Sequence, residues 1–357
     1  RLSVVNGPIS VWDASDRRQR RFSSTDINVG LDPASNGLNV TFASSGYSGR
    51  WTATIERTLD ASSGGHIVSA DFQQLTLGDV IPSLGDDKGL FVADVPLYGR
   101  ASMRVNADGD VVEASANIDL GAGTLRFREE PSAKQRSVLL DEATIRLRWD
   151  IASKTIVVEP STFFFGNTRG LVTGTIRQDG DPSAGRYTFA FESPGTVMAP
   201  PDSGAPPMVA QRISVSGVAD LGAETLTFDN IIVVTTDGSL AAAGSLGFEP
   251  GKTPSVAFAA SFSPMPLSTL KTIWIPFIAP NAREWAMEHL ISGELKQGHY
   301  EVSVPAGVLF KKPVRLPDNA MKLDMRMENV TFSTIGALPP IQKAAGNIVL
   351  SGSTFGV

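Results

Sequence analysis

The chain has 357 residues, 42% of them hydrophobic and 19% charged, a globular balance that excludes wholesale disorder. The formal net charge is −6 with thinly spread basic residues, which argues against a nucleic-acid partner. Cysteine is absent, so disulfides, thiolate metal sites and cysteine nucleophiles are excluded. The chain starts at Arg1 and stops directly after a strand-like stretch, and we expect it to be an internal part of a longer protein.

The glycines and prolines fall between short runs of alternating polarity, which predicts a mainly β chain. A short helix is a weaker prediction at residues 77–84. Tight hairpin turns are predicted at residues 106–109, 179–180 and 237–238, because each contains an Asp-Gly pair that suits positive φ. Residues 116–127 resemble residues 217–228, and each copy is interpreted as a strand, a Leu-Gly-Ala turn and a returning strand.

Several segments place apolar side chains on one face only. In residues 144–151 the apolar residues alternate with Thr, Arg and Asp, as expected for a strand with one face in water. The same alternation recurs in residues 187–191, 213–215, 256–262 and 321–328. A proline-rich stretch at residues 193–207 is predicted to be a long loop within one hairpin. The segment 1–265 is therefore interpreted as a repetitive β-sheet.

A helical insertion is predicted at residues 266–293, followed by further sheet at residues 294–357. Residues 266–277 have apolar side chains at helical spacing, and Pro276 ends the pattern. A second helix is predicted to be capped by Asn281, with Glu284 completing a capping box and Gly293 ending it.

Catalytic and metal-binding patterns are not found in the sequence. The three histidines, His66, His289 and His299, lack partners at ligand spacing, and His66 is placed in a loop after two glycines. The Asn106, Asp108 and Asp110 cluster is interpreted as a hairpin turn rather than a calcium loop. We therefore expect no enzyme activity, no metal and no cofactor.

The apolar strand faces have two interpretations. They pack together as the sealed core of a β-sandwich, or a long curled sheet leaves them open as a groove suited to acyl chains. Alternation alone does not separate the two, because both involve the same residues. The candidate groove residues are Ile145, Leu147, Trp149, Phe189, Phe191, Phe258 and Phe262.

Residues 267–298, LSTLKTIWIPFIAPNAREWAMEHLISGELKQG, resemble the AsmA-like proteins of Gram-negative envelopes, and are most similar to the YhdP type. The resemblance rests on a Trp-Pro-like segment at Trp274, the Arg283-x-Trp285 helix and a glycine-containing return strand. It covers roughly residues 265–357, where Leu338-Pro339-Pro340 and residues 346–352 also fit. Trp274-Ile275-Pro276 departs from the family's pattern by an inserted isoleucine.

The resemblance implies a segment of a periplasmic bridge, anchored in the inner membrane by a part of the protein outside this chain. It also implies an elongated, curled antiparallel β-groove that shelters phospholipid acyl chains between the inner and outer membranes. Two alternatives stay open. One is a periplasmic assembly factor that binds outer-membrane protein strands by β-augmentation, and the other is a closed β-sandwich surface module.

Overall fold

The computed structural model describes residues 2–12, 19–32, 37–46, 49–76, 79, 91–127, 136–180, 185–200, 203, 205–249, 252–275, 280–308, 320–334, 338–351 and 354–356. The chain is mainly β, with 73% of residues in strands and 6% in helices, so the predicted fold class is confirmed. It comprises two compact units, Arg1–Phe165 and Gly166–Val357. The boundary between them lies inside the segment 1–265 that the sequence suggested as one stretch of sheet.

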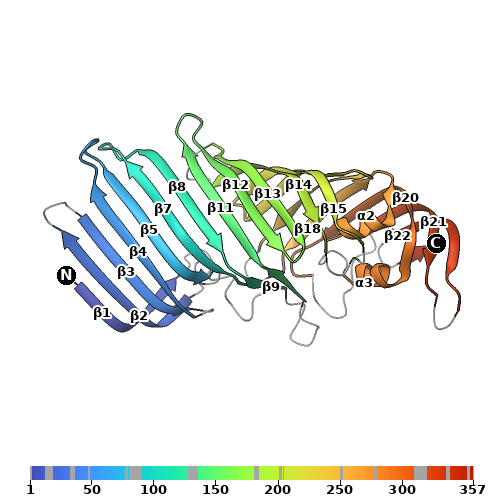
Figure 1. Cartoon of the computed structure of the whole chain (residues 1–357), viewed down its shortest axis with the longest axis horizontal. Coiled ribbons are helices and arrows are strands. Elements are labelled where there is room, and N and C mark those ends of the chain that lie inside the picture. Colours follow the sequence, from blue (N-terminus) through green and yellow to red (C-terminus); the bar gives the residue numbers. More distant parts are fainter. Residues whose placement is uncertain are drawn as a thin grey trace. The chain divides into compact units, whose positions relative to one another are not determined.

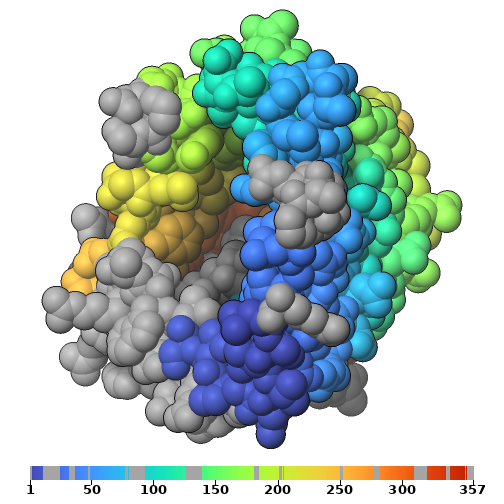
Figure 2. All heavy atoms as spheres, turned by 90° about the vertical axis from the view of Figure 1, so that its left-hand side faces the viewer, coloured from blue at the N-terminus to red at the C-terminus, as the bar shows by residue number. Residues whose placement is uncertain are grey.

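Unit 1 contains an antiparallel sheet with the strand order β1-β2-β3-β4-β5-β7-β8-β11-β12 (Figure 1). Strands that follow each other along the chain are mostly neighbours, as in a meander of hairpins. In Figure 2 these strands rise from the dark blue β1 to the teal β8 as a curved wall. Their bounds are β1 (Leu2–Trp12), β2 (Gln19–Asp32), β3 (Gly37–Gly46), β4 (Gly49–Leu59), β5 (His66–Thr76), β7 (Pro96–Val105), β8 (Val111–Leu120), β11 (Glu142–Asp150) and β12 (Thr155–Phe165).

A second, smaller sheet in unit 1 consists of β6 (Phe91–Asp94), β9 (Gly123–Phe127) and β10 (Arg136–Leu140), with β9 in the middle. Val95, Leu140 and Ala143 form a buried cluster beside it, and Leu120 and Phe163 pack against this cluster. The small sheet therefore contributes to the one buried hydrophobic cluster found among the described residues of unit 1.

Unit 2 contains an antiparallel sheet with the order β13-β14-β15-β16-β17-β18-β20-β21-β22-β23. The two helices and the short β19 are inserted between β18 and β20, which confirms the predicted helical insertion between strands (Figure 1). The bounds are β13 (Thr168–Gln178), β14 (Arg186–Met198), β15 (Met208–Asp220), β16 (Thr225–Thr235), β17 (Ser239–Gly247), β18 (Ser255–Phe262), β19 (Met265–Pro266), α2 (Leu267–Ile273), α3 (Pro280–His289), β20 (Leu290–Val304), β21 (Met321–Phe332), β22 (Ile341–Ser351) and β23 (Thr354–Gly356).

All three predicted positions lie in connections between paired strands, but only two of the three glycines have the predicted positive φ. Gly109 and Gly180 have φ of 92° and 74° in the turns between β7 and β8 and between β13 and β14. The turn at Asp237 and Gly238 joins β16 to β17, and Gly238 accepts a hydrogen bond from the backbone of Thr235. The proline-rich loop also lies within one hairpin, because β14 pairs with β15. It is shorter than predicted, since β14 continues to Met198 and Pro194 lies in the strand.

Three other predictions are wrong. His66 begins β5 and does not lie in a loop. Asn281 lies inside α3, which starts at Pro280 and ends at His289, so Gly293 falls in β20 instead of ending the helix. A Cβ at Gly293 would lie 2.9 Å from Cα of Val330, so close packing explains this glycine. The predicted helix at residues 77–84 lies outside the described residues except for Asp79.

The first copy of the internal repeat also differs from its prediction. The second copy is the β15-β16 hairpin, in which the Asp220 carboxylate accepts the Ala223 N–H at 2.8 Å and closes the turn. In the first copy the equivalent Asp119 pairs with Arg146 of β11 at 2.9 Å. The returning segment becomes β9 and joins the small sheet, where Gly123 lies against the backbone of Asp94.

Candidate functional site

The sheet of unit 1 has one apolar and one polar face. Its register aligns apolar side chains across consecutive strands into rows. The first row contains Val4, Ile27, Phe42, Ala53, Phe72, Gly99, Ile118 and Ile145. The second row contains Leu2, Val29, Val40, Ile55, Ala70, Ala101, Ala116, Leu147 and Val158. Trp149 lies beside the second row and faces Ile156 on β12.

Most residues of these rows are half-buried or exposed, and Val158 at the β12 end of the second row is the buried exception. Ile145, Leu147 and Trp149 are all partly exposed, and Ile55 is 38% exposed. In the described part of unit 1, these side chains are shielded in part by their neighbours across the strands. In the middle of the second row the side chains are short, because alanine occupies the row on β5, β7 and β8. Ala70, Ala101 and Ala116 therefore form the floor of a trough, which we call the alanine trough.

The opposite face of unit 1 is polar and carries ion pairs. Arg100 lies 3.9 Å from Asp71, Arg148 lies 3.1 Å from Glu159, and Arg104 lies 2.8 Å from Glu113. All six of these side chains are substantially exposed, so the pairs contribute little to stability. They mark this face as the one in contact with water.

Unit 2 carries a row of aromatic rings on its apolar face. Phe191 and Phe189 of β14 stack with centroids 5.6 Å apart. Phe228 of β16 lies 6.0 Å from Phe189, edge to face, and 5.7 Å from Phe258 of β18. Such ring pairs add about 0.5–1.5 kcal/mol beyond the burial of their area. The structure thus brings three predicted residues, Phe189, Phe191 and Phe258, into one aromatic row.

Glycines on the strands between the phenylalanines make this row possible. Gly217 lies between Phe189 and Phe228 in the register, and Gly244 lies between Phe228 and Phe258. A Cβ would lie 2.9 Å from the Phe189 ring at Gly217 and 2.5 Å from the Phe258 ring at Gly244. The rings therefore occupy space that any other residue would fill.

An apolar concavity of about 450 Å³ lies along part of the aromatic row. This volume falls within the range of roughly 300–1,000 Å³ that is typical of small-molecule sites. It contains only apolar lining surface, which suits a hydrocarbon rather than a polar ligand. The lining residues are Val172, Ile176, Tyr187, Phe189, Phe191, Val215, Ala219, Leu226 and Phe228.

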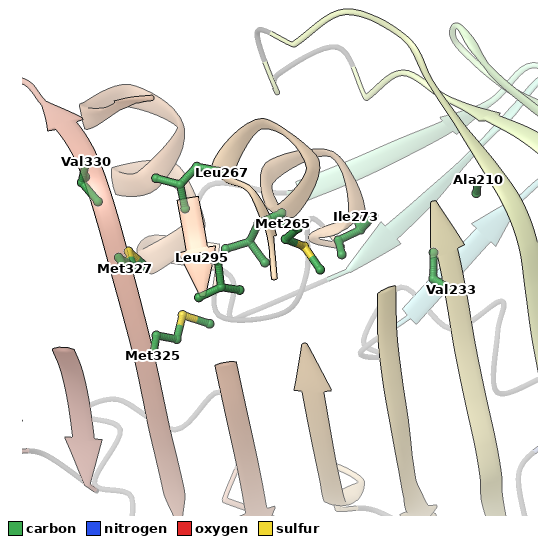
Figure 3. Close-up of a cluster of buried hydrophobic side chains, with 10 residues drawn as sticks. Ala210, Val233, Met265, Leu267, Ile273, Leu295, Met325, Met327 and Val330 are labelled. Atoms are coloured by element: carbon green, nitrogen blue, oxygen red, sulfur yellow. The ribbon is translucent and has the colours of Figure 1, made fainter. Parts of the chain in front are cut away.

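One end of the same apolar face is closed by α2. Figure 3 shows side chains from α2, β20 and β21 gathered into one cluster. Leu267 and Leu295 are 2% and 0% exposed, and Met325 and Met327 are buried with them. Phe262 packs against this cluster, so the structure places it at the closed end and apart from Phe258 on the same strand. The cluster comprises Ala210, Val233, Met265, Leu267, Leu270, Ile273, Leu295, Met325, Met327 and Val330.

The helical insertion is held together by two cations, the buried Arg283 and the partly buried Lys271. Arg283 is 4% exposed and donates from Nε to the backbone carbonyl of Trp274 at 2.9 Å. Lys271 of α2 donates to the backbone carbonyls of Met287 and Leu290 at the end of α3, and burial lowers the pKa of its ammonium group. Arg283 thus has a structural role, since it joins α3 to the end of α2.

The two tryptophans of the insertion differ in their exposure. Trp274 is half-buried at the end of α2, whereas Trp285 is 50% exposed and lies 5.4 Å from the ring of His289. Trp285 therefore belongs to the surface of α3. On the same helix, Ala286 is buried while its neighbour Trp285 is exposed.

A Ser-His-Glu arrangement lies on the polar face of unit 2. Ser261 Oγ is 3.3 Å from His299 Nδ1, and His299 Nε2 is 2.9 Å from Glu301 Oε1, which lowers the pKa of Glu301. Neighbouring backbone groups are engaged in the ladders of β18, β20 and β21, so they do not form an oxyanion hole. Among the described residues, no group of three His, Cys, Asp or Glu side chains could hold a metal ion.

Sequence reasoning missed Phe228, although it lies at the centre of the aromatic row. Its only sequence signal is the match of Thr225-Leu226-Thr227-Phe228 to the first repeat copy, and the bulge between Phe228 and Ile231 breaks simple alternation. Among the described helices, none combines the length and the apolar character that crossing a membrane requires. Comparisons with protein-family models, with curated proteins and with solved structures gave no match.

Proposed function

We propose that this chain is a segment of a bridge that shelters phospholipid acyl chains and transfers them between the inner and outer membranes of a Gram-negative envelope. The observation that carries the proposal is the set of apolar rows, which cross consecutive strands of unit 1 on one face while remaining half-exposed. With strands about 4.8 Å apart, a row crossing eight strands offers a path of roughly 35 Å.

Acyl chains fit this face for a physical reason. Each methylene removed from water contributes about 0.8 kcal/mol, so a lipid crossing an aqueous compartment needs a continuous apolar lining. The aromatic row and the apolar concavity of unit 2 support the same chemistry. Half-exposed rows also argue against the sealed β-sandwich, in which such residues would be buried. In this proposal the protein works by binding, without catalysis.

The location in the envelope rests on the resemblance of residues 265–357 to the AsmA-like proteins. It supports a periplasmic segment whose membrane anchors belong to parts of the protein outside this chain. Phospholipid is the proposed cargo, and both membranes are the proposed partners.

Lipid extraction and mass spectrometry of the purified chain test the proposal. We expect phospholipid to co-purify with the natural chain and to be reduced in Phe258→Asp, because that change puts a carboxylate into the aromatic row of unit 2. Ala259→Asp is the matched control, since Ala259 is exposed and its side chain alternates to the other face of β18. It should retain lipid. Folded protein without phospholipid, or equal lipid in both variants, would contradict the proposal.

A further inference from the structure

Among the described residues, Arg57 is the one charged residue on the apolar face of strands β3, β4, β5, β7, β8 and β11. It alternates on β4 with Ile55 and Leu59, and its partners across the strands are Leu38 and Val68. Each of these four neighbours is apolar. A permanently charged guanidinium therefore stands beside the second apolar row, about 7 Å along the strand from Ile55.

No hydrogen bond or ion pair is found for Arg57 within the described part of the chain, and its Nε is buried without a partner. The polar-face arginines of unit 1 behave differently, as Arg100 and Arg148 show by their ion pairs with Asp71 and Glu159. Arg57 as a whole is only partly buried, and Nε is the guanidinium nitrogen that is buried without a partner. The guanidinium thus has unused donors on the face that we assign to the lipid.

His66 lies next to Arg57 and has the same property. Arg57 faces Val68 and His66 faces Leu59, so the two residues are diagonal neighbours on β4 and β5, with Cα atoms about 7–8 Å apart. The Nε2 atom of His66 is buried without a hydrogen-bond partner. Because that nitrogen donates when it carries a proton, the two side chains can offer converging donors to one acceptor group.

The alanine trough begins one residue pair away from this site. Ala70 is two residues after Val68 on β5, and Ala101 and Ala116 continue the trough on β7 and β8. A ligand that fills both places needs an anionic head and an apolar chain. Inorganic phosphate would satisfy only the first requirement.

We propose that Arg57, with His66 beside it, binds the phosphate of an anionic phospholipid whose acyl chain lies in the alanine trough. This inference rests on the proposed function and adds a defined binding site for the headgroup. Arginine suits this role, since its planar fork donates two parallel hydrogen bonds to phosphate oxygens. A structural role would instead have the Arg57 stem cover apolar surface while its head reaches water.

The test compares two soluble amphiphiles with the same chain, dodecanoyl lysophosphatidylglycerol and monododecanoylglycerol, below their micelle-forming concentrations. Binding is measured by calorimetry for the natural chain, Arg57→Leu, Arg57→Lys and the polar-face control Arg100→Leu. Leucine continues the apolar row at position 57, so Arg57→Leu should fold, which circular dichroism checks. Inorganic phosphate alone is the third ligand.

We expect the natural chain to bind the anionic amphiphile at least about tenfold more tightly than the neutral one, as a charge-assisted hydrogen bond provides. Arg57→Leu should remove that preference while leaving the neutral ligand's affinity unchanged. Arg57→Lys should keep part of the preference, and Arg100→Leu should keep all of it.

Two results would overturn the inference while leaving the groove intact: an equal preference in the natural chain and Arg57→Leu, or an equal loss in Arg100→Leu. Inorganic phosphate that binds as tightly as the anionic amphiphile would assign a free-anion site instead. If the folded natural chain binds neither amphiphile, the proposed function fails at unit 1 and the headgroup binding site fails with it.

Discussion

Phe258 and Phe262 lie four residues apart on β18 and on the same apolar face, yet they belong to different environments. Phe262 packs against the cluster that α2 closes, whereas Phe258 contacts Phe228 in the open aromatic row. Both residues alternate identically in the sequence. The difference therefore arises from what covers the sheet, and it separates a part of the face that stabilises the fold from a part that is available to a ligand.

The largest expected effect comes from placing a charge in the buried cluster that α2 closes. Leu295→Asp puts a carboxylate where the side chain is 0% exposed, and we expect a loss of about 4 kcal/mol or more in the free energy of unfolding. Gln297→Asp on the same strand is the control, because Gln297 is exposed and should tolerate the change within about 0.5 kcal/mol. Urea denaturation followed by circular dichroism measures both. Similar stability of the two variants would mean that α2 does not close the cluster.

Truncating Phe258 and Phe262 to alanine compares the stability contributions of the open row and the closed cluster with the same residue type. Phe262→Ala should lower the free energy of unfolding by about 3 kcal/mol, since it leaves a cavity beside the buried cluster. Phe258→Ala should cost only about 1 kcal/mol, because its ring is held by one aromatic neighbour and open surface. The same denaturation experiment compares them. Equal losses would place Phe258 in a closed core and argue against a groove at β18.

The anchoring of the helices is a smaller effect. Arg283→Leu removes the hydrogen bond to the Trp274 carbonyl, and a hydrogen bond from a charged donor contributes about 2 kcal/mol. Amide hydrogen exchange should show faster exchange in α2 and α3 while the amides of β14 to β16 stay protected. Unchanged exchange in both helices would assign their docking to the apolar contacts of α2 alone.

The smallest expected effect concerns pH at the turn before His66. Hydrogen bonds from the Ser62 and Ser63 hydroxyls and the Ser62 N–H lower the pKa of Asp60 to about 2 from 3.8. Because the folded pKa is depressed, this contribution to stability is present above about pH 4 and is lost as the pH falls toward 2. Asp60→Asn should flatten this part of the stability profile. If the stability of the variant depends on pH in the same way, Asp60 does not contribute to the acid dependence.

The alternation of apolar and polar residues predicted the strands well, because this two-residue period depends only on strand geometry and on one face being exposed to solvent. It placed Ile145, Leu147 and Trp149 correctly on one face of β11. It failed where the pairing of a strand depends on residues far away in the sequence. One example is Gly123, which packs against the backbone of Asp94, so that the segment after it forms β9 beside β6. The different environments of Phe258 and Phe262 could not be predicted from alternation either, because they depend on a helix inserted after the strand. Arg57 was visible in principle, as the one charge that interrupts the run Trp51, Ala53, Ile55, Leu59.

Site-specific photo-crosslinking in cells tests the central claim most directly, which is that the open apolar face contacts lipid tails. A photoreactive residue at Trp149 or Phe258 should form phospholipid adducts, whereas the same residue at Arg148 or Ala259, which alternate to the other face, should not. Adducts at all four positions, or at none of them while the protein is folded, would contradict the account.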